Sequence, residues 1–232
     1  MKCIGFNQGQ YGDLCINTVA CRSFKERFPE YKLHFGINKK YSSLSPIFEN
    51  NELIDSIHIW DAYDGWPSEK DIEYISKEKY DFIFNPMPRH FEEHWYINFH
   101  QTQENCRVHG LNSPDNLQVY LNKYFDTDKN DKCVALNLFA ETRGNSKTPD
   151  LNQAKEIADL LVKKGYNPIQ IGLPDQPQIC EKRFTGSFFD SIKFVLSCDF
   201  LLTVDSAMAW IASGYSFPTI GIYAYTYYQI GR

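Results

Sequence analysis

Several common functional signatures are missing from this sequence of 232 residues. It has no Walker A loop, no G-x-G-x-x-G dinucleotide fingerprint, and no apolar run close to the roughly 20 residues that a membrane-spanning helix needs. It also lacks a basic excess, because 24 Lys and Arg stand against 29 Asp and Glu, for a net charge of −5. Binding through nucleic-acid phosphates requires clustered cations on a basic domain. We therefore expect no nucleic-acid partner, no transmembrane segment and no cofactor. A small phosphorylated ligand stays possible, because one or two cations and a helix N-terminus can hold it.

The cysteines form no C-x-x-C pair either. There are seven of them, scattered along the chain, and Cys3, Cys133 and Cys198 lie in or beside apolar runs. This pattern is typical of buried, reduced thiols. The sequence also starts without a charged leader and a long apolar stretch. We expect a cytoplasmic protein.

What the sequence does contain is a regular alternation of strand and helix patterns. In the first half, strands are predicted at 2–7, 32–36, 56–60 and 81–84, an amphipathic helix at 13–28, a short helix or turn at 43–48, and a helix at 68–78. In the second half, strands are predicted at 133–138, 168–171, 200–204 and 218–222, and helices at 151–164, 190–197 and 206–213. Strands that alternate with helices predict parallel sheets.

A polar, charged segment at 126–132 separates the two halves. Such a shift in composition is typical of a linker between domains. We predict an N-terminal domain at 1–126 and a C-terminal domain at 133–232. The simplest architecture is α/β, with two Rossmann-like parallel-sheet domains that face a central cleft.

One junction in the second half is typical of a ligand site. The apolar run 200–204 leads into Asp205 and Ser206, which is the pattern of a buried strand followed by a capped helix. Open α/β sheets bind ligands at the carboxyl ends of their strands. This junction is predicted to hold a phosphate or a sugar. The alternative is that Asp205 only caps the helix.

A second carboxylate follows the first predicted strand. Gly12 and Asp13 lie where a loop enters the first helix. Asp13 thus places a carboxylate at the mouth of the sheet; the alternative is that it only caps the helix or interacts with the helix dipole.

Several ordered segments together resemble the heptosyltransferase family, glycosyltransferase family 9, which has the two-domain GT-B fold. These segments are Gly12-Asp13-Leu14, Ala20 to Pro29, Asn51 to Ile57, Lys147-Thr148-Pro149 and Asp205 to Trp210. Asp13 matches the aspartate of the family's Gly-Asp turn, and Asp205-Ser206 matches the start of its Asp-Ser-Gly-Pro-Met-His signature. The order and spacing of the segments cover most of the chain.

The resemblance implies an inverting, metal-independent glycosyltransferase. Its donor would be a nucleotide-diphosphate sugar such as ADP-heptose, and its acceptor a glycan or a lipid-linked glycan, as in lipopolysaccharide. Asp13 would be the general base that takes the proton from the acceptor hydroxyl. The donor-binding residues that the resemblance implies are Thr142, Lys147, Asp205, Ser206 and Ala207. Among these, Lys147 and the amides near Ser206 would stabilise the leaving diphosphate; the alternative for Lys147 is a solvated loop charge.

The sequence departs from the family pattern in the last segment. Ala207 replaces the family's glycine, the proline is missing, and Trp210 replaces the histidine. Trp210 could stack on a base or a sugar, or it could belong to the core. These departures, and the end of the chain soon after the last predicted strand, leave a second hypothesis open: a non-catalytic relative that binds a nucleotide or a glycan.

Three weaker signals compete with this interpretation. His90 to His94 matches the H-x-x-E-H pattern of some zinc enzymes, but no third ligand is evident, so we expect no metal site. Ser206 lacks the G-x-S-x-G context of a hydrolase nucleophile. The tyrosines from Tyr223 to Tyr228 could stack on a carbohydrate or pack on the body of the protein.

Overall fold

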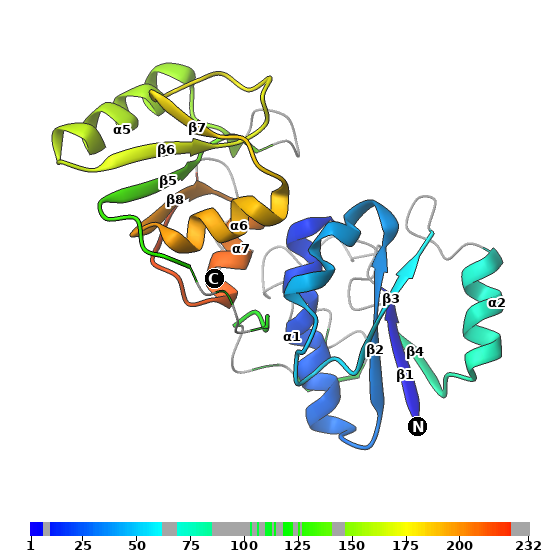
Figure 1. Ribbon diagram of the computed structural model, residues 1–232. Helices are drawn as coiled ribbons and strands as arrows, with labels where there is room; N and C mark the ends of the chain where they lie inside the picture. The colour runs from blue at the N-terminus through cyan, green and yellow to red at the C-terminus, as the bar shows by residue number, and fades with distance from the viewer. Residues whose placement is uncertain are drawn as a thin grey trace. The chain divides into compact units, whose positions relative to one another are not determined.

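The computed structural model describes residues 1–6, 10–61, 69–84, 103, 106, 110–112, 114, 118–122, 125, 127–140 and 147–223. The chain forms two compact units, one consisting mainly of Met1–Asn122 and one that begins at Lys123. Each unit contains a parallel sheet with helices packed on it (Figure 1). The predicted α/β class with two parallel sheets is confirmed.

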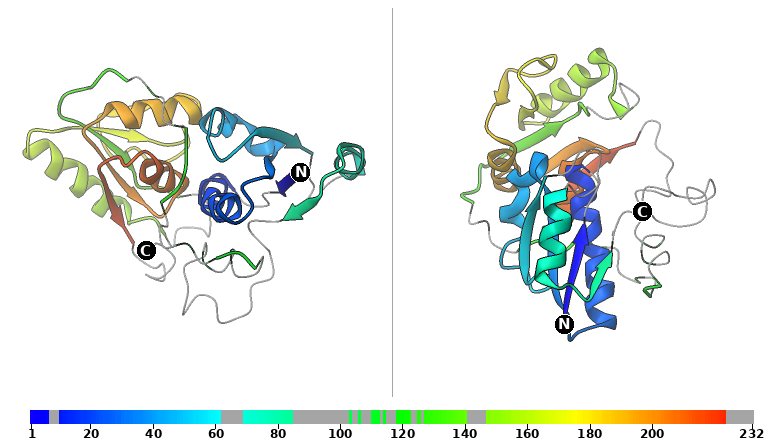
Figure 2. Two further views of the ribbon diagram at one scale, coloured as in Figure 1. Left: turned by 90° about the horizontal axis from the view of Figure 1, so that it is seen from below. Right: turned by 90° about the vertical axis from the view of Figure 1, so that its right-hand side faces the viewer.

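The first unit has a four-stranded sheet in the order β3-β2-β1-β4, in which all neighbouring strands are parallel. Its elements are β1 (Lys2–Phe6), α1 (Tyr11–Arg27), β2 (Lys32–Asn38), the 3₁₀ helix η1 (Lys39–Ile47), β3 (Ser56–Trp60), α2 (Glu69–Glu78) and β4 (Phe82–Phe84). α1 and η1 lie on one face of this sheet and α2 on the other, as Figures 1 and 2 both show. Right-handed crossovers require this arrangement, because the chain moves outward from β1 to β3 and then returns past β1 to β4.

Helix α1 differs from its prediction. It begins at Tyr11, two residues before the predicted start, and every residue from Leu14 to Cys21 is buried. A further segment packs against the helix, since the amide of Tyr120 donates a hydrogen bond to Thr18 Oγ1 at 2.8 Å. The prediction of an amphipathic helix was therefore wrong: α1 is an internal helix of the unit.

The second unit has a five-stranded parallel sheet in the order β7-β6-β5-β8-β9. Its elements are β5 (Cys133–Asn137), α5 (Leu151–Lys163), β6 (Asn167–Ile171), β7 (Lys182–Phe184), α6 (Phe188–Ser197), β8 (Phe200–Val204), α7 (Ala207–Gly214) and β9 (Thr219–Ile222). α5 covers one face, and α6 and α7 lie together on the other (Figure 1).

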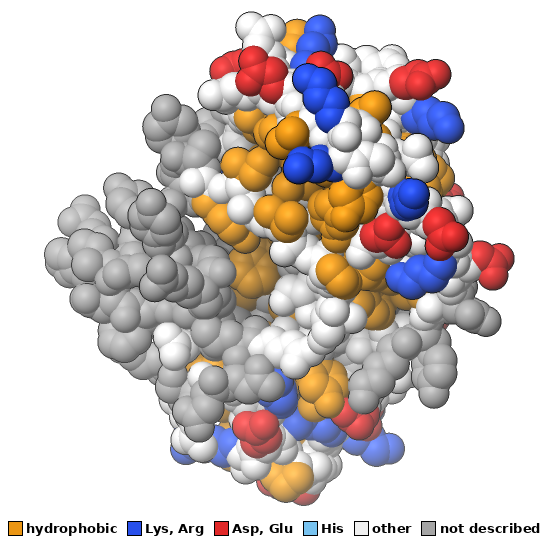
Figure 3. Space-filling view, turned by 90° about the vertical axis from the view of Figure 1, so that its left-hand side faces the viewer, with side chains coloured by type: hydrophobic (Ala, Val, Ile, Leu, Met, Phe, Trp, Pro, Cys, Tyr) orange, Lys and Arg blue, Asp and Glu red, His pale blue; other side chains and the backbone are white. Residues whose placement is uncertain are grey.

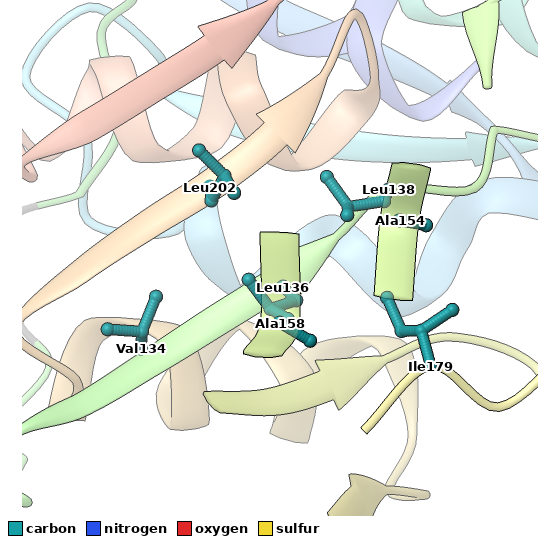
Figure 4. Packing of buried hydrophobic residues seen from close by; sticks show 7 residues of the cluster. All are labelled: Val134, Leu136, Leu138, Ala154, Ala158, Ile179 and Leu202. Atoms are coloured by element: carbon teal, nitrogen blue, oxygen red, sulfur yellow. The ribbon is translucent and has the colours of Figure 1, made fainter. Parts of the chain in front are cut away.

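The core under α5 consists of residues that alternate along the strands. Val134 and Leu136 of β5 point to the face where Ala154 and Ala158 of α5 pack (Figure 4). The alanines allow a close approach of the helix, and each buried Val or Leu contributes about 1.5–3 kcal/mol. Leu138, Ile179 and Leu202 complete the cluster. Because side chains of a strand alternate between faces, Asn137 projects to the opposite face, toward α7.

Two details of the second sheet correct the prediction. The sequence analysis predicts no strand between 171 and 190, where the structure has the edge strand β7, and it predicts that the last strand begins at Pro218. β9 instead begins at Thr219, although the Pro218 carbonyl still accepts a hydrogen bond from the Leu201 amide at 2.9 Å. Proline supplies the acceptor to the ladder but has no N–H to continue it.

Each sheet has one point at which the strand order reverses. In the first sheet it lies between β1 and β4, and in the second between β5 and β8. At such points the neighbouring strands continue to opposite faces, which opens a crevice beyond their carboxyl ends where α/β proteins bind ligands.

The surface of the second unit exposes several large hydrophobic side chains. Leu160 and Val162 of α5 and Ile220 of β9 are more than half exposed. Figure 3 shows one face of the molecule on which hydrophobic side chains lie among charged ones. Within the described ranges, no helix combines the length and apolar character needed to cross a bilayer.

Candidate functional site

The carboxyl edge of the second sheet carries a close ion pair. Lys147 lies shortly before α5 and Asp205 directly follows β8, and Lys147 Nζ is 2.5 Å from Asp205 Oδ2. Both side chains are largely buried, with 14% and 19% of their surface exposed. Lys147 is therefore not the solvated loop charge of the alternative interpretation. It is a cation held at the reversal point between β5 and β8.

Three polar side chains lie beside this pair on the α7 face. Asn137 ends β5 and pairs in register with Thr203 of β8. Asn137 Oδ1 accepts a hydrogen bond from the Ser206 hydroxyl at 3.0 Å and lies 3.2 Å from the Thr203 hydroxyl. The hydroxyls of Thr203 and Ser206 are 3.1 Å apart. This network fastens the start of α7 to the ends of β5 and β8.

Ser206, not Asp205, is the N-cap residue of α7. Its hydroxyl makes no capping bond to the helix and donates a hydrogen bond to Asn137 Oδ1. The idea that Asp205 is only an N-cap was wrong, since its carboxylate pairs with Lys147. A helix start without a side-chain cap, next to a lysine, is a suitable place for an anion. Ala207 is the first residue of the helix.

One aromatic residue, Tyr223, lies near this edge, and Trp210 belongs to the helix that begins there. The Tyr223 ring lies over Gly221, where a Cβ atom would come within 2.4 Å of Tyr223 Cε2. Burial and the nearby Asp205 carboxylate raise the pKa of the Tyr223 phenol, so the phenol stays protonated and can donate a hydrogen bond. Trp210 of α7 is half-buried, so it is neither a full core residue nor a fully exposed ring.

The first unit holds the predicted base in the first turn of α1. Asp13 is half-buried, and its Oδ2 accepts a hydrogen bond from the Gln10 amide at 2.8 Å. This contact stabilises the helix start and also keeps the carboxylate in place. Gly12 precedes it within the same turn. Tyr11, two residues before Asp13, meets the Tyr41 ring edge-on, with the ring centroids 4.9 Å apart.

Some predicted residues lie outside the part of the chain that the structure describes. They include Thr142 and the whole of 90–94 with its two histidines. Among the described residues, no three His, Cys, Asp or Glu side chains come together as metal ligands.

Sequence reasoning missed Asn137 and Thr203. Both lie within predicted strands, where a single polar residue in an apolar run does not by itself indicate a function. Only the register of β5 with β8 shows that the two side chains face the same helix start. A signal was present, because a polar residue at the end of a buried parallel strand lies at the ligand-binding edge.

No protein-family model and no curated protein matches the chain. Solved structures do match, and they identify the class of fold: it is that of the GT-B glycosyltransferases of family 9. The resemblance seen in the sequence is thereby confirmed at the level of the fold.

Three matches illustrate the likeness. A glycosyl transferase family 9 structure from Veillonella parvula has a TM-score of 0.72 at 16% identity, covering 99% of this chain and 83% of its own. ADP-heptose LPS heptosyltransferase II from E. coli has a TM-score of 0.70 at 11% identity, covering 95% and 84%. The E. coli heptosyltransferase WaaC with ADP-2-deoxy-2-fluoro heptose has a TM-score of 0.65 at 12% identity, covering 95% and 88%.

Proposed function

We propose that this protein is an inverting glycosyltransferase that transfers a sugar from a nucleotide-diphosphate donor to a hydroxyl of a glycan or lipid-linked glycan. The observation that carries the proposal is the Lys147–Asp205 pair beside the start of α7, at the reversal point of the second sheet. The fold likeness to heptosyltransferases favours a donor similar to ADP-heptose.

The second unit would bind the donor. Lys147 would approach the diphosphate, and the first amides of α7 would supply further hydrogen bonds to its oxygens. Asp205 holds Lys147 and thereby limits its motion before the ligand arrives. These groups would stabilise the charge that develops on the leaving nucleoside diphosphate. We propose that this electrostatic stabilisation comes from the protein without a metal ion.

The first unit would supply the base. Asp13 would take the proton from the acceptor hydroxyl as its oxygen attacks the anomeric carbon from the side opposite the leaving diphosphate, which inverts the configuration. A general base contributes typically 10²–10⁴-fold to the rate. We further propose a cytoplasmic location, on the basis of the cysteine pattern of the sequence.

The variant Asp13→Asn tests the base. The amide keeps the size of the side chain but cannot accept a proton, so transfer should fall by about 10²-fold or more while donor affinity stays within about twofold. The measurements are release of ADP from ADP-heptose in the presence of a glycan acceptor, and calorimetric binding of ADP.

Asp190→Asn is the matched control, because Asp190 occupies the same position in the first turn of α6 and also contacts its N-cap region. It should leave transfer unchanged. Full transfer by Asp13→Asn would refute the base assignment. Donor binding by the wild-type protein without any transfer would instead support the second hypothesis, a non-catalytic relative that binds a nucleotide sugar.

A further inference from the structure

Two cysteines meet at the end of the second sheet that lies away from the candidate site. Cys133 is the first residue of β5, and Cys198 is the C-cap residue of α6, just before β8. Their Sγ atoms are 3.1 Å apart, although 65 positions separate them in the sequence. Both are free thiols. The proposed glycosyl transfer uses neither of them.

The backbone fixes both residues. The Cys133 amide donates to the Asn130 carbonyl at 3.1 Å, and its carbonyl accepts from the Asp199 amide at 2.8 Å. The Cys198 amide donates to the Val195 carbonyl at 3.0 Å. A disulfide has an S–S length of about 2.05 Å, so closing the gap requires a movement of about 1 Å. Small side-chain rotations can provide that movement without displacing the sheet.

The two thiols differ in acidity. The hydrogen bond between the sulfurs lowers the pKa of Cys133 and raises that of Cys198, so Cys133 is the thiol that ionises first. Only 3% of Cys133 and none of Cys198 is exposed. This burial favours a small oxidant over a bulky disulfide such as oxidised glutathione.

We propose that Cys133 and Cys198 are a modification site at which hydrogen peroxide forms an intramolecular disulfide. The Cys133 thiolate attacks a peroxide oxygen, the O–O bond breaks, and a sulfenic acid and a hydroxide form; the hydroxide takes up the proton that Cys133 lost. The Cys198 sulfur then attacks the Cys133 sulfur, the S–O bond breaks, and the departing hydroxide leaves as water with the Cys198 proton. Two thiols and one peroxide thus give one disulfide and two waters.

The cross-link would join the two strands that flank the reversal point. β5 and β8 are neighbours in the sheet, and their opposite ends carry Asn137 and Asp205. The segment before β5 is already held at the same place, because Asn130 Nδ2 donates to Ser197 Oγ at 2.8 Å and Lys129 Nζ donates to the Leu196 carbonyl at 3.2 Å. A disulfide there should stabilise the second unit and leave the ligand edge unchanged.

Peptide mapping of the folded protein after treatment with hydrogen peroxide tests the proposal. Trypsin cleaves after Lys132 and Lys193, so the two cysteines fall on different peptides, 133–143 and one that begins at Phe194. Without reductant, these peptides should appear as one cross-linked species lighter by two hydrogens than their sum. The midpoint of thermal unfolding should rise by about 10 °C, and dithiothreitol should reverse both effects.

The variants Cys133→Ser and Cys198→Ser should lose the cross-link and the shift, whereas Cys180→Ser should keep both. Cys180 is a suitable control because it is the more exposed thiol of this unit. The proposal would be overturned if peroxide oxidised Cys180 of the wild-type protein but peptide 133–143 was recovered without the cross-link. Because the mapping of the wild-type protein decides the outcome, a variant that fails to fold does not weaken the test.

Discussion

Lys147 is the residue on which the proposed donor site depends most. Its ammonium is largely buried and its only recorded partner in the described part of the chain is Asp205, so any phosphate that binds there must share the lysine with this carboxylate. A hydrogen bond to a charged group contributes about 1.5–3 kcal/mol. The pair also explains why either residue alone is ambiguous in the sequence: a lysine in a loop and an aspartate after a strand form an ion pair only when the fold brings them together.

We predict that Lys147→Met weakens ADP binding by about tenfold to a hundredfold, since it removes one such hydrogen bond and leaves Asp205 to repel the diphosphate. Calorimetric titration with ADP measures the effect. Lys155→Met in the exposed part of α5 is the control and should bind like the wild type. Equal affinity of Lys147→Met and the wild type for ADP would contradict a role of Lys147 in the proposed donor site.

At the scale of the element, α5 shows how local sequence fixes a boundary. Asp150 is its N-cap, and its Oδ1 accepts hydrogen bonds from the amides of Asn152 and Gln153, both at 2.9 Å. Gln153 Oε1 in turn accepts from the Asp150 amide at 3.3 Å, which completes a capping box. The cap residue lies three residues after Lys147, so it fixes the end of the loop that carries the lysine.

We predict that Asp150→Ala lowers the free energy of unfolding by about 1 kcal/mol, because two helix amides lose their acceptor. Chemical denaturation followed by circular dichroism measures the change. Asp159→Ala, in the exposed middle of the same helix, should cost much less. A loss of equal size in both variants would show that the cap is not what stabilises the helix start.

At the scale of the whole molecule, the pH dependence of stability is set in part by a titratable group of the first unit, His34. This histidine of β2 has Nδ1 2.6 Å from the Tyr80 hydroxyl. Burial lowers the pKa of His34 from its usual 6.5, and Lys2 and His58 lower it further, while Asp55 and Glu78 act in the opposite direction. The folded protein therefore holds His34 mainly neutral at a pH where the unfolded chain is already protonated.

We predict that stability falls as the pH decreases below about 6.5, since the unfolded state then binds a proton that the folded state does not. The neutral imidazole contributes its full stability above that pH, and this contribution is lost as the pH falls from the unfolded-state pKa through the lower pKa of the folded state. Thermal unfolding between about pH 7.5 and about pH 5.5 should show a smaller decrease for His34→Gln than for the wild type. Equal slopes for both proteins would exclude His34 as the cause.

The strands and helices themselves could be predicted because the spacing of apolar residues, and the Gly, Pro and capping residues at the ends of elements, are local properties of the sequence. β3 and β8 have the predicted limits, and Gly165 ends the turn after α5 with a φ of +84°, which glycine adopts easily. The edge strand β7 could not be predicted in this way. Its three residues, Lys182 to Phe184, have no apolar run and become a strand only because β6 offers its free edge.

The sequence by itself determined the class of fold, since alternating strands and helices of these lengths can bury their apolar sides only in parallel α/β sheets. It also placed Asp205 directly after a buried strand, at the edge where α/β sheets bind ligands, Asp13 at the start of the first helix and Lys147 in the loop before α5. The tertiary structure alone decided which of these groups interact. Lys147 and Asp205 are 58 positions apart, and Asn137 and Ser206 are 69 positions apart, so their contacts depend on the order and register of β5 and β8. Pairing between distant segments is a property of the whole sheet, so it cannot be predicted from a local sequence pattern.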